Sequence, residues 1–170
     1  MFDTIIKEIE NYPENLVGSF RSEMDVKGGL ELKDLVITGN FQSEKVIYLG
    51  EVFNSFRFDY SYIDKKVKLS NIILKKTKGS FVGNFFFDQE NGDYRYDFKP
   101  LDLKLREFSF YKEILAGLNG KVSGSLYGER KSDEKRNRLD IAIIDGKIGS
   151  EDVGLSKALL LWNDDEVTIN

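Results

Sequence analysis

The octamer VKLSNIIL at residues 67–74 decides the fold, because it joins two runs of alternating apolar residues through one extra residue. Similar octamers are LELKDLVI at residues 30–37, LKLREFSF at 103–110 and LDIAIIDG at 139–146. Their starting points are separated by 37, 36 and 36 residues. A regular interval of this length is typical of a supersecondary unit that buries its apolar side by stacking on its neighbours.

Each octamer changes phase in its middle. In the first copy Leu30 and Leu32 alternate with charged residues, and the apolar set resumes at Leu35 and Ile37. An extra residue in a pattern of period two indicates a β-bulge or a bend, because the later apolar residues would otherwise point to the opposite side. The fourth octamer fits this pattern least well. We expect each unit to hold about three strands of one sheet and to be bent at its octamer.

The segments between the octamers indicate further antiparallel strands. Residues 56–62, FRFDYSY, place four aromatic side chains on one face, and a turn at 64–66 leads into the second octamer. Asn91-Gly92 is a strong hairpin signal between the strands at 81–87 and 94–98. The fold class expected is therefore all-β, an antiparallel meander of about ten strands joined by short turns.

Two short helices are expected beside these strands. Residues 3–11 place three isoleucines on one helical face, and residues 111–118 return to helical spacing. We expect a single β-rich domain over 1–170, and the strand-like pattern at 167–170 favours a segment of a longer repetitive protein. No run approaches the ~18 apolar residues of a membrane-spanning helix, and the acidic N-terminus is unlike a signal peptide. The chain is then either cytoplasmic or an internal piece.

Composition argues against several classes of function. The 25 basic and 29 acidic residues are interspersed and give a net charge of -4, so no basic stripe predicts a nucleic-acid partner. The chain has neither cysteine nor histidine, which removes a thiol nucleophile, the commonest general base and the commonest metal ligand. The oxygen-rich residues 88–93 are expected to form a hairpin turn and not a calcium loop. We expect no catalytic residue, no metal, no cofactor and no enzymatic activity.

An aromatic face is the remaining candidate site. Aromatic residues occupy alternate positions on three successive predicted strands, with Gly83 interrupting the second of them. They are Phe56, Phe58, Tyr60, Tyr62, Phe81, Phe85, Phe87, Tyr94, Tyr96 and Phe98. These side chains would fill an ordinary sandwich core if a second sheet covered them. Strands joined by short turns belong to one sheet, however, and a single meander must close, fold over or leave its apolar face for another molecule. A large exposed apolar face marks a lipid or partner site.

The phrases LKDLVITGNF, TKGSFVGNFFF and FYKEILAGLNGKVSGSLYGE resemble the repetitive region of the AsmA-like proteins, and among them the TamB-type translocation and assembly proteins of diderm bacteria. The resemblance covers residues 30–128. It implies a long β-sheet folded lengthwise into a taco-like groove with an apolar interior. It also implies a periplasmic location, an inner-membrane anchor outside this chain, an outer-membrane β-barrel partner, and a role in moving phospholipid between the two membranes.

The hypothesis favoured by the sequence is a non-enzymatic lipid conduit of the bacterial envelope, in which the ten aromatic residues contact phospholipid acyl chains. Two alternatives stay open. The chain could be an outer-membrane β-barrel or part of one, with the aromatic face toward lipid. It could also be an extracellular structural β domain such as an adhesin, in which the same residues form a closed core.

Overall fold

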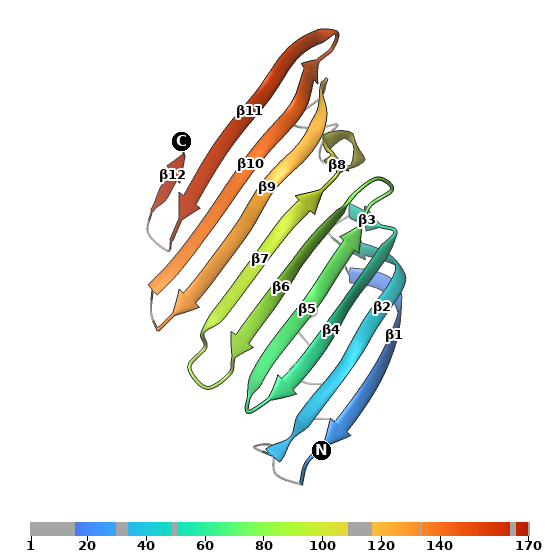
Figure 1. Cartoon of the computed structure of the whole chain (residues 1–170), viewed down its shortest axis with the longest axis vertical. Helices are drawn as coiled ribbons and strands as arrows, with labels where there is room; N and C mark the ends of the chain where they lie inside the picture. The colour runs from blue at the N-terminus through green and yellow to red at the C-terminus, as the bar shows by residue number, and fades with distance from the viewer. Residues whose placement is uncertain are drawn as a thin grey trace.

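The computed structural model describes residues 16–29, 34–48, 51–108, 117–132, 134–163 and 166–169. Its strands are β1 (Leu16–Lys27), β2 (Val36–Tyr48), β3 (Glu51–Phe53), β4 (Ser55–Ile63), β5 (Lys66–Lys75), β6 (Ser80–Asp88), β7 (Tyr94–Leu101), β8 (Leu103–Lys104), β9 (Leu118–Lys131), β10 (Glu134–Ile148), β11 (Glu151–Trp162) and β12 (Val167–Ile169). Within the described ranges these twelve strands form one antiparallel sheet, ordered β1-β2-β4-β5-β6-β7-β9-β10-β11-β12 (Figure 1).

The predicted all-β antiparallel meander is confirmed. We call each position in the strand order a row. β3 and β4 share one row because both pair with β2, and β7 and β8 share another because both pair with β9. Asn54 separates the first pair, and Asp102, with a φ of 52°, separates the second. The twelve described strands therefore make ten rows, in agreement with the strand number expected from the sequence.

The two predicted turns are also confirmed. Asp64 and Lys65 connect β4 to β5 with φ values of 50° and 59°, the positive values required by a two-residue turn whose twist matches the strands. Asn91 and Gly92 lie in the longer connection between β6 and β7, where Gly92 has a φ of 74° and donates its N–H to the Asp88 carbonyl at 2.9 Å.

The phase shift of the second octamer is a β-bulge. On β5 the pairing with β6 jumps from Leu69 opposite Phe85 to Ile72 opposite Gly83, so β5 holds one residue more than its neighbour. Asn71 supplies the unusual backbone, with a φ of 53°, and its side-chain amide donates to Asp59 at 2.7 Å. The bulge returns Ile72 to the side on which Leu69 lies, as the sequence pattern predicts.

The third and fourth octamers behave differently. In the third, the 3-10 helix η2 (Leu105–Glu107) follows β8 and brings Phe108 against the buried Leu103 and Leu105. In the fourth, alternation continues through Ile144, which lies opposite Lys121 on the charged side and is 40% exposed, and the register with β9 shifts only after it, where Asp145 has a φ of 55°. A bulge in the middle of that octamer was therefore the wrong expectation.

The expectation of three strands per repeat is also wrong. The first octamer enters β2, the second is β5, the third begins in β8 and the fourth lies in β10. These strands occupy every second row of the sheet. Each interval of about 36 residues therefore spans two rows, because one up-and-down pair of strands with its turns uses this length. Residues 30–33 of the first octamer lie outside the described ranges.

The two predicted helices are not found in the described part of the chain. Residues 3–11 and 111–116 lie outside it, and Leu118 already belongs to β9, so the helical phrase does not extend to residue 118. Among the residues described, no helix combines the length and the apolar character needed to span a bilayer.

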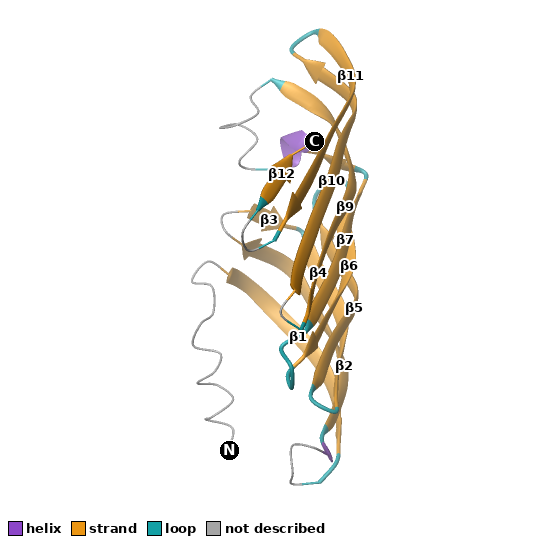
Figure 2. Ribbon diagram, turned by 90° about the vertical axis from the view of Figure 1, so that its left-hand side faces the viewer, coloured by secondary structure: helices purple, strands orange, loops and turns teal. Residues whose placement is uncertain are grey.

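The described strands lie in a single curved layer. Seen along its edge in Figure 2, the layer bends so that β12 and parts of β1 and β3 lie on the same side as η2. Leu103, Leu105 and Val122 form a small buried cluster on that side, with Phe81, Phe108 and Ile141 packed against it. The sheet is open in the described residues, since β1 and β12 each pair with one neighbour.

Candidate functional site

Cross-strand pairing places the predicted aromatic residues on one side of the sheet. Residues opposite each other in antiparallel strands point to the same side. Tyr60 lies opposite Leu69, Leu69 opposite Phe85, and Phe85 opposite Tyr96. The pairing places the whole predicted set on this side. We call this set, together with Leu69, the apolar face. Its predicted members are Phe56, Phe58, Tyr60, Tyr62, Phe81, Phe85, Phe87, Tyr94, Tyr96 and Phe98.

The apolar face is neither buried nor fully exposed. All ten predicted residues have intermediate accessibility, in contrast to Leu103, which has no exposed surface. A sandwich core would enclose large aromatic residues on the inner side of its sheets. These ten residues instead keep part of their surface accessible, which a molecule lying on the sheet could cover.

Ring contacts divide the face into two aromatic clusters. Toward β1, Phe41 stacks on Phe58 with centroids 4.7 Å apart, and Phe20, Phe56 and Tyr60 extend this cluster. On β7, Tyr94, Tyr96 and Phe98 form a row with centroids 6.2 and 6.3 Å apart. Phe81 contacts Phe108 at 5.9 Å. Phe20, Phe41 and Phe108 belong to the site but were not predicted.

Three aromatic side chains pack closely against glycines of the neighbouring strands. A Cβ atom at Gly39 would come within 2.7 Å of the Tyr60 ring. A Cβ atom at Gly83 would overlap Phe98, and one at Gly128 would overlap Tyr96. Glycine at these positions therefore leaves the space that the three rings occupy.

Polar atoms on the apolar face are paired with each other. The Tyr96 hydroxyl donates to Oδ1 of Asn137 at 2.9 Å, and the Asn137 amide donates to the Trp162 carbonyl at 3.3 Å. Burial, with a smaller contribution from Tyr94, raises the pKa of Tyr96 above its ordinary value of 10.0. The hydroxyl therefore stays protonated and keeps this bond across the face at neutral pH.

The opposite side of the sheet is mainly charged. Arg57, Lys68, Arg95 and Lys99 alternate with the aromatic residues on their strands and so point away from the apolar face. Arg138 pairs with Asp140 at 2.8 Å on this side. The two sides therefore differ sharply in polarity, although Ile73, Val82 and Phe86 also lie on the charged side.

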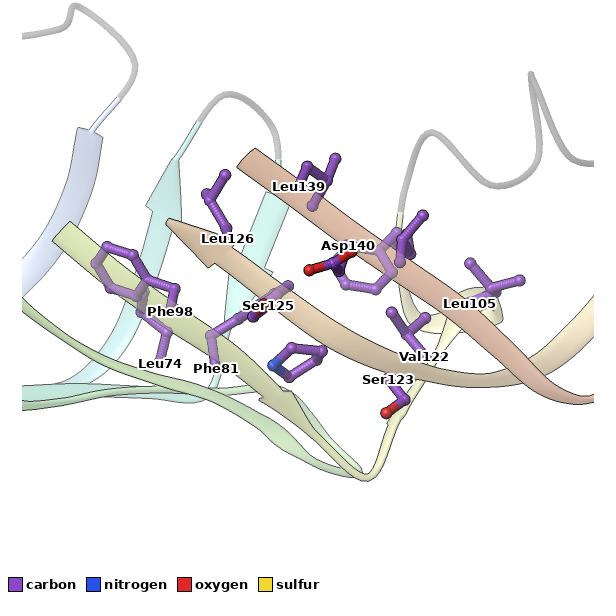
Figure 3. A pocket seen from close by; sticks show the side chains of 13 residues that line it. Leu74, Phe81, Phe98, Leu105, Val122, Ser123, Ser125, Leu126, Leu139 and Asp140 are labelled. Atoms are coloured by element: carbon purple, nitrogen blue, oxygen red, sulfur yellow. The ribbon is translucent and has the colours of Figure 1, made fainter. Parts of the chain in front are cut away.

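A cavity of about 390 Å³ opens on the apolar face between η2 and strands β5 to β10. Figure 3 shows Leu105, Val122, Leu126 and Leu139 on one side of the ribbons and Ser123 on the other. Only Phe81 and Phe98 of the predicted site residues line it. The other apolar lining residues were missed: Leu74, Pro100, Leu105, Phe108, Val122, Leu126, Leu139 and Ile141. The period-two patterns at 122–126 and 139–143 were the available signal.

A buried lysine contacts Phe108, one of the residues that line this cavity. Lys76, in the turn after β5, is 3% exposed, and its Nζ lies 2.5 Å from Oε2 of Glu51. The same ammonium group lies 4.7 Å from the centroid of the Phe53 ring and 5.1 Å from that of Phe108. Lys76 thus connects β3 to Phe108, a residue that lines the cavity.

The described residues contain no group of three histidine, cysteine, aspartate or glutamate side chains placed to hold a metal. In the loop at 88–93, Oδ1 of Asp88 accepts the N–H of Glu90 and Oδ1 of Asn91 accepts that of Asp93. Oδ1 of Asp93 accepts the N–H of Ser132 at 2.8 Å. These oxygens shape the turn, so the turn expected for this segment is confirmed.

The fold and the face together define a class of protein, an open single-layer β-sheet with one apolar and one charged side. No family model, no curated protein and no solved structure matches this chain. The resemblance to the AsmA-like proteins therefore stays a prediction from the sequence phrases.

Proposed function

We propose that this protein is a non-enzymatic lipid-holding β domain whose apolar face binds phospholipid acyl chains. The observation that carries the proposal is the intermediate exposure of all ten predicted aromatic residues on one face of an open sheet. A cavity of about 390 Å³ adds to this support, because ligand pockets in proteins usually measure about 300–1,000 Å³ and are lined mainly by apolar side chains.

The free energy available from such a face is sufficient for lipid binding. Each methylene group removed from water contributes about 0.8 kcal/mol, so about ten methylenes contribute about 8 kcal/mol. This corresponds to a dissociation constant of about 1 µM before the cost of ordering the chain. A binding site of this kind needs no specific polar contact with the ligand.

The curl of the sheet supports a lengthwise groove of taco-like shape, because β1, β3 and β12 bend toward the side that carries the cavity (Figure 2). Together with the resemblance of the glycine-punctuated phrases, it leads us to propose a place in the periplasm of a diderm bacterium. The role there would be phospholipid transport between the membranes or assembly of outer-membrane proteins.

Blocking the cavity tests the proposal. We expect the purified protein to carry phospholipid extractable with organic solvent and to bind a fluorescent fatty acid. Leu139→Trp would fill the cavity and reduce fatty-acid binding at least tenfold, whereas Leu161→Trp, on the charged side, would leave it unchanged. A lipid-free protein that binds no fatty acid, or equal binding by the two variants, would contradict the proposal.

A further inference from the structure

Strand β1 is an open and regular edge of the sheet. In the described ranges it pairs only with β2, and the extra residue at their register shift lies in β2, so β1 alternates without interruption over twelve residues. Val17 is 61% exposed, Phe20 46%, Met24 63% and Val26 53%. A long edge strand with regular alternation offers its backbone N–H and C=O groups to another strand.

The opposite edge is less regular. Strand β12 pairs with β11 at residues 160–162. Farther along β11 the register shifts at Gly154, which has a φ of 63° and donates its N–H to Asp152. Irregular backbone of this kind twists an edge away from pairing. Of the two outer edges in the described residues, β1 is therefore the longer regular one and the better suited to accept a strand.

The charges on β1 select a second β1 strand in one register. Arg21, Glu23, Asp25 and Lys27 point to the charged side of the sheet. If Ser22 lies opposite Ser22 of a second copy, Arg21 faces Glu23 twice, Phe20 faces Met24 twice, and no like charges meet. Pairing centred on Arg21 or Glu23 places identical charges opposite each other, and pairing centred on Met24 places Glu23 opposite Asp25. Pairing centred on Phe20 brings no opposite charges together, and pairing centred on Val26 is limited to residues 25–27. The Ser22 register alone combines a long overlap with attractive charge pairs. Opposed like charges destabilise a strand pair.

We propose that two copies of this chain pair through antiparallel β1 strands, with Ser22 of each copy facing Ser22 of the other. The two-fold axis of such a pair is perpendicular to the sheet. Because opposed residues share a side, the apolar faces of both copies lie on the same side and form one continuous surface. This interface is independent of lipid, and it would double the width of the face described above.

Charge reversal tests the interface by sedimentation equilibrium. We expect the wild type to dimerise, Arg21→Glu to weaken the dimer roughly tenfold or more because two attractive pairs become repulsive, and Arg21→Glu/Glu23→Arg to restore it. Asp25→Arg is the matched control, since residue 25 faces the neutral Ser19 of the second copy in this register. A monomeric wild type, or equal weakening by Arg21→Glu and Asp25→Arg, would overturn the proposal.

A covalent test is available because the chain has no cysteine. Ser22→Cys should give a disulfide-linked dimer on mild oxidation, whereas Lys27→Cys, which faces Val17 of the second copy, should stay monomeric under denaturing conditions. Equal cross-linking by the two variants would contradict the register. Both tests report association and not lipid content, so their failure leaves the proposed lipid binding intact.

Discussion

The ammonium group of Lys76 lies 5.1 Å from the centroid of the Phe108 ring, and the two residues are 32 positions apart in the chain. Glu51 and Phe53 complete the surroundings of this ammonium group, so three segments of the chain meet at one nearly buried charge. The contact keeps Phe108 over the cavity of the apolar face. Lys76 is thus a structural residue in contact with the lining of the proposed lipid site.

Replacing this lysine should lower stability and loosen the cavity. Lys76→Met keeps most of the side-chain volume but removes the buried ammonium group beside the Glu51 carboxylate, and we expect a loss of about 1–3 kcal/mol in the free energy of unfolding. Lys75→Met, at the neighbouring exposed position, should cost less than about 0.5 kcal/mol. Urea denaturation followed by tryptophan fluorescence measures both. Equal effects would show that the buried ion pair does not stabilise the fold.

The close packing of aromatic rings against glycine should make Gly83 sensitive to any side chain. A Cβ atom there would overlap the Asp97 carbonyl and the Phe98 ring, so Gly83→Ala should cost about 1–3 kcal/mol. Gly29→Ala provides the control, because the nearest atom to its Cβ would be Oδ2 of Asp34 at 3.8 Å. Thermal unfolding followed by circular dichroism should separate the two variants. A wild-type melting temperature for Gly83→Ala would contradict the packing.

The raised pKa of Tyr96 predicts a loss of stability in alkali. Its hydroxyl binds the proton more tightly in the folded state than in the unfolded chain, so the stabilisation is complete below about pH 10 and falls as the pH rises toward the raised pKa. Tyr127 contributes in the same direction, because its hydrogen bond to Glu129 raises its pKa. Tyr96→Phe should reduce the slope of unfolding free energy against pH above pH 10. An unchanged slope would contradict the assignment.

Sequence periodicity was sufficient to predict the strands and the side to which their residues point. Alternation at 56–62 and at 94–98 requires only the two-residue repeat of a β-strand, which local sequence determines. The bulge at Asn71 was predictable for the same reason, because Leu69 and Ile72 must lie on one side of the sheet. Asn91-Gly92 was likewise a local signal.

Features that depend on distant segments could not be predicted in this way. Leu74 and Leu139 line the same cavity although they are far apart in the sequence. Glu51 and Phe108 are likewise distant in the sequence and both contact Lys76. These neighbours are determined by which strands pair and in which register, and neither follows from a local repeat. The two-row spacing of the octamers was missed because their interval fits different numbers of strands, depending on strand length.

The central claim is that lipid lies on the apolar face, and site-specific photo-cross-linking tests it most directly. A benzophenone-bearing amino acid placed at Phe98 or at Lys99 probes the two sides of β7, which alternate at these positions. After irradiation of cells that express each variant, mass spectrometry of the purified protein should find phospholipid attached at position 98 and none at position 99. Absence of lipid at position 98, or equal attachment at both positions, would contradict a lipid-binding apolar face.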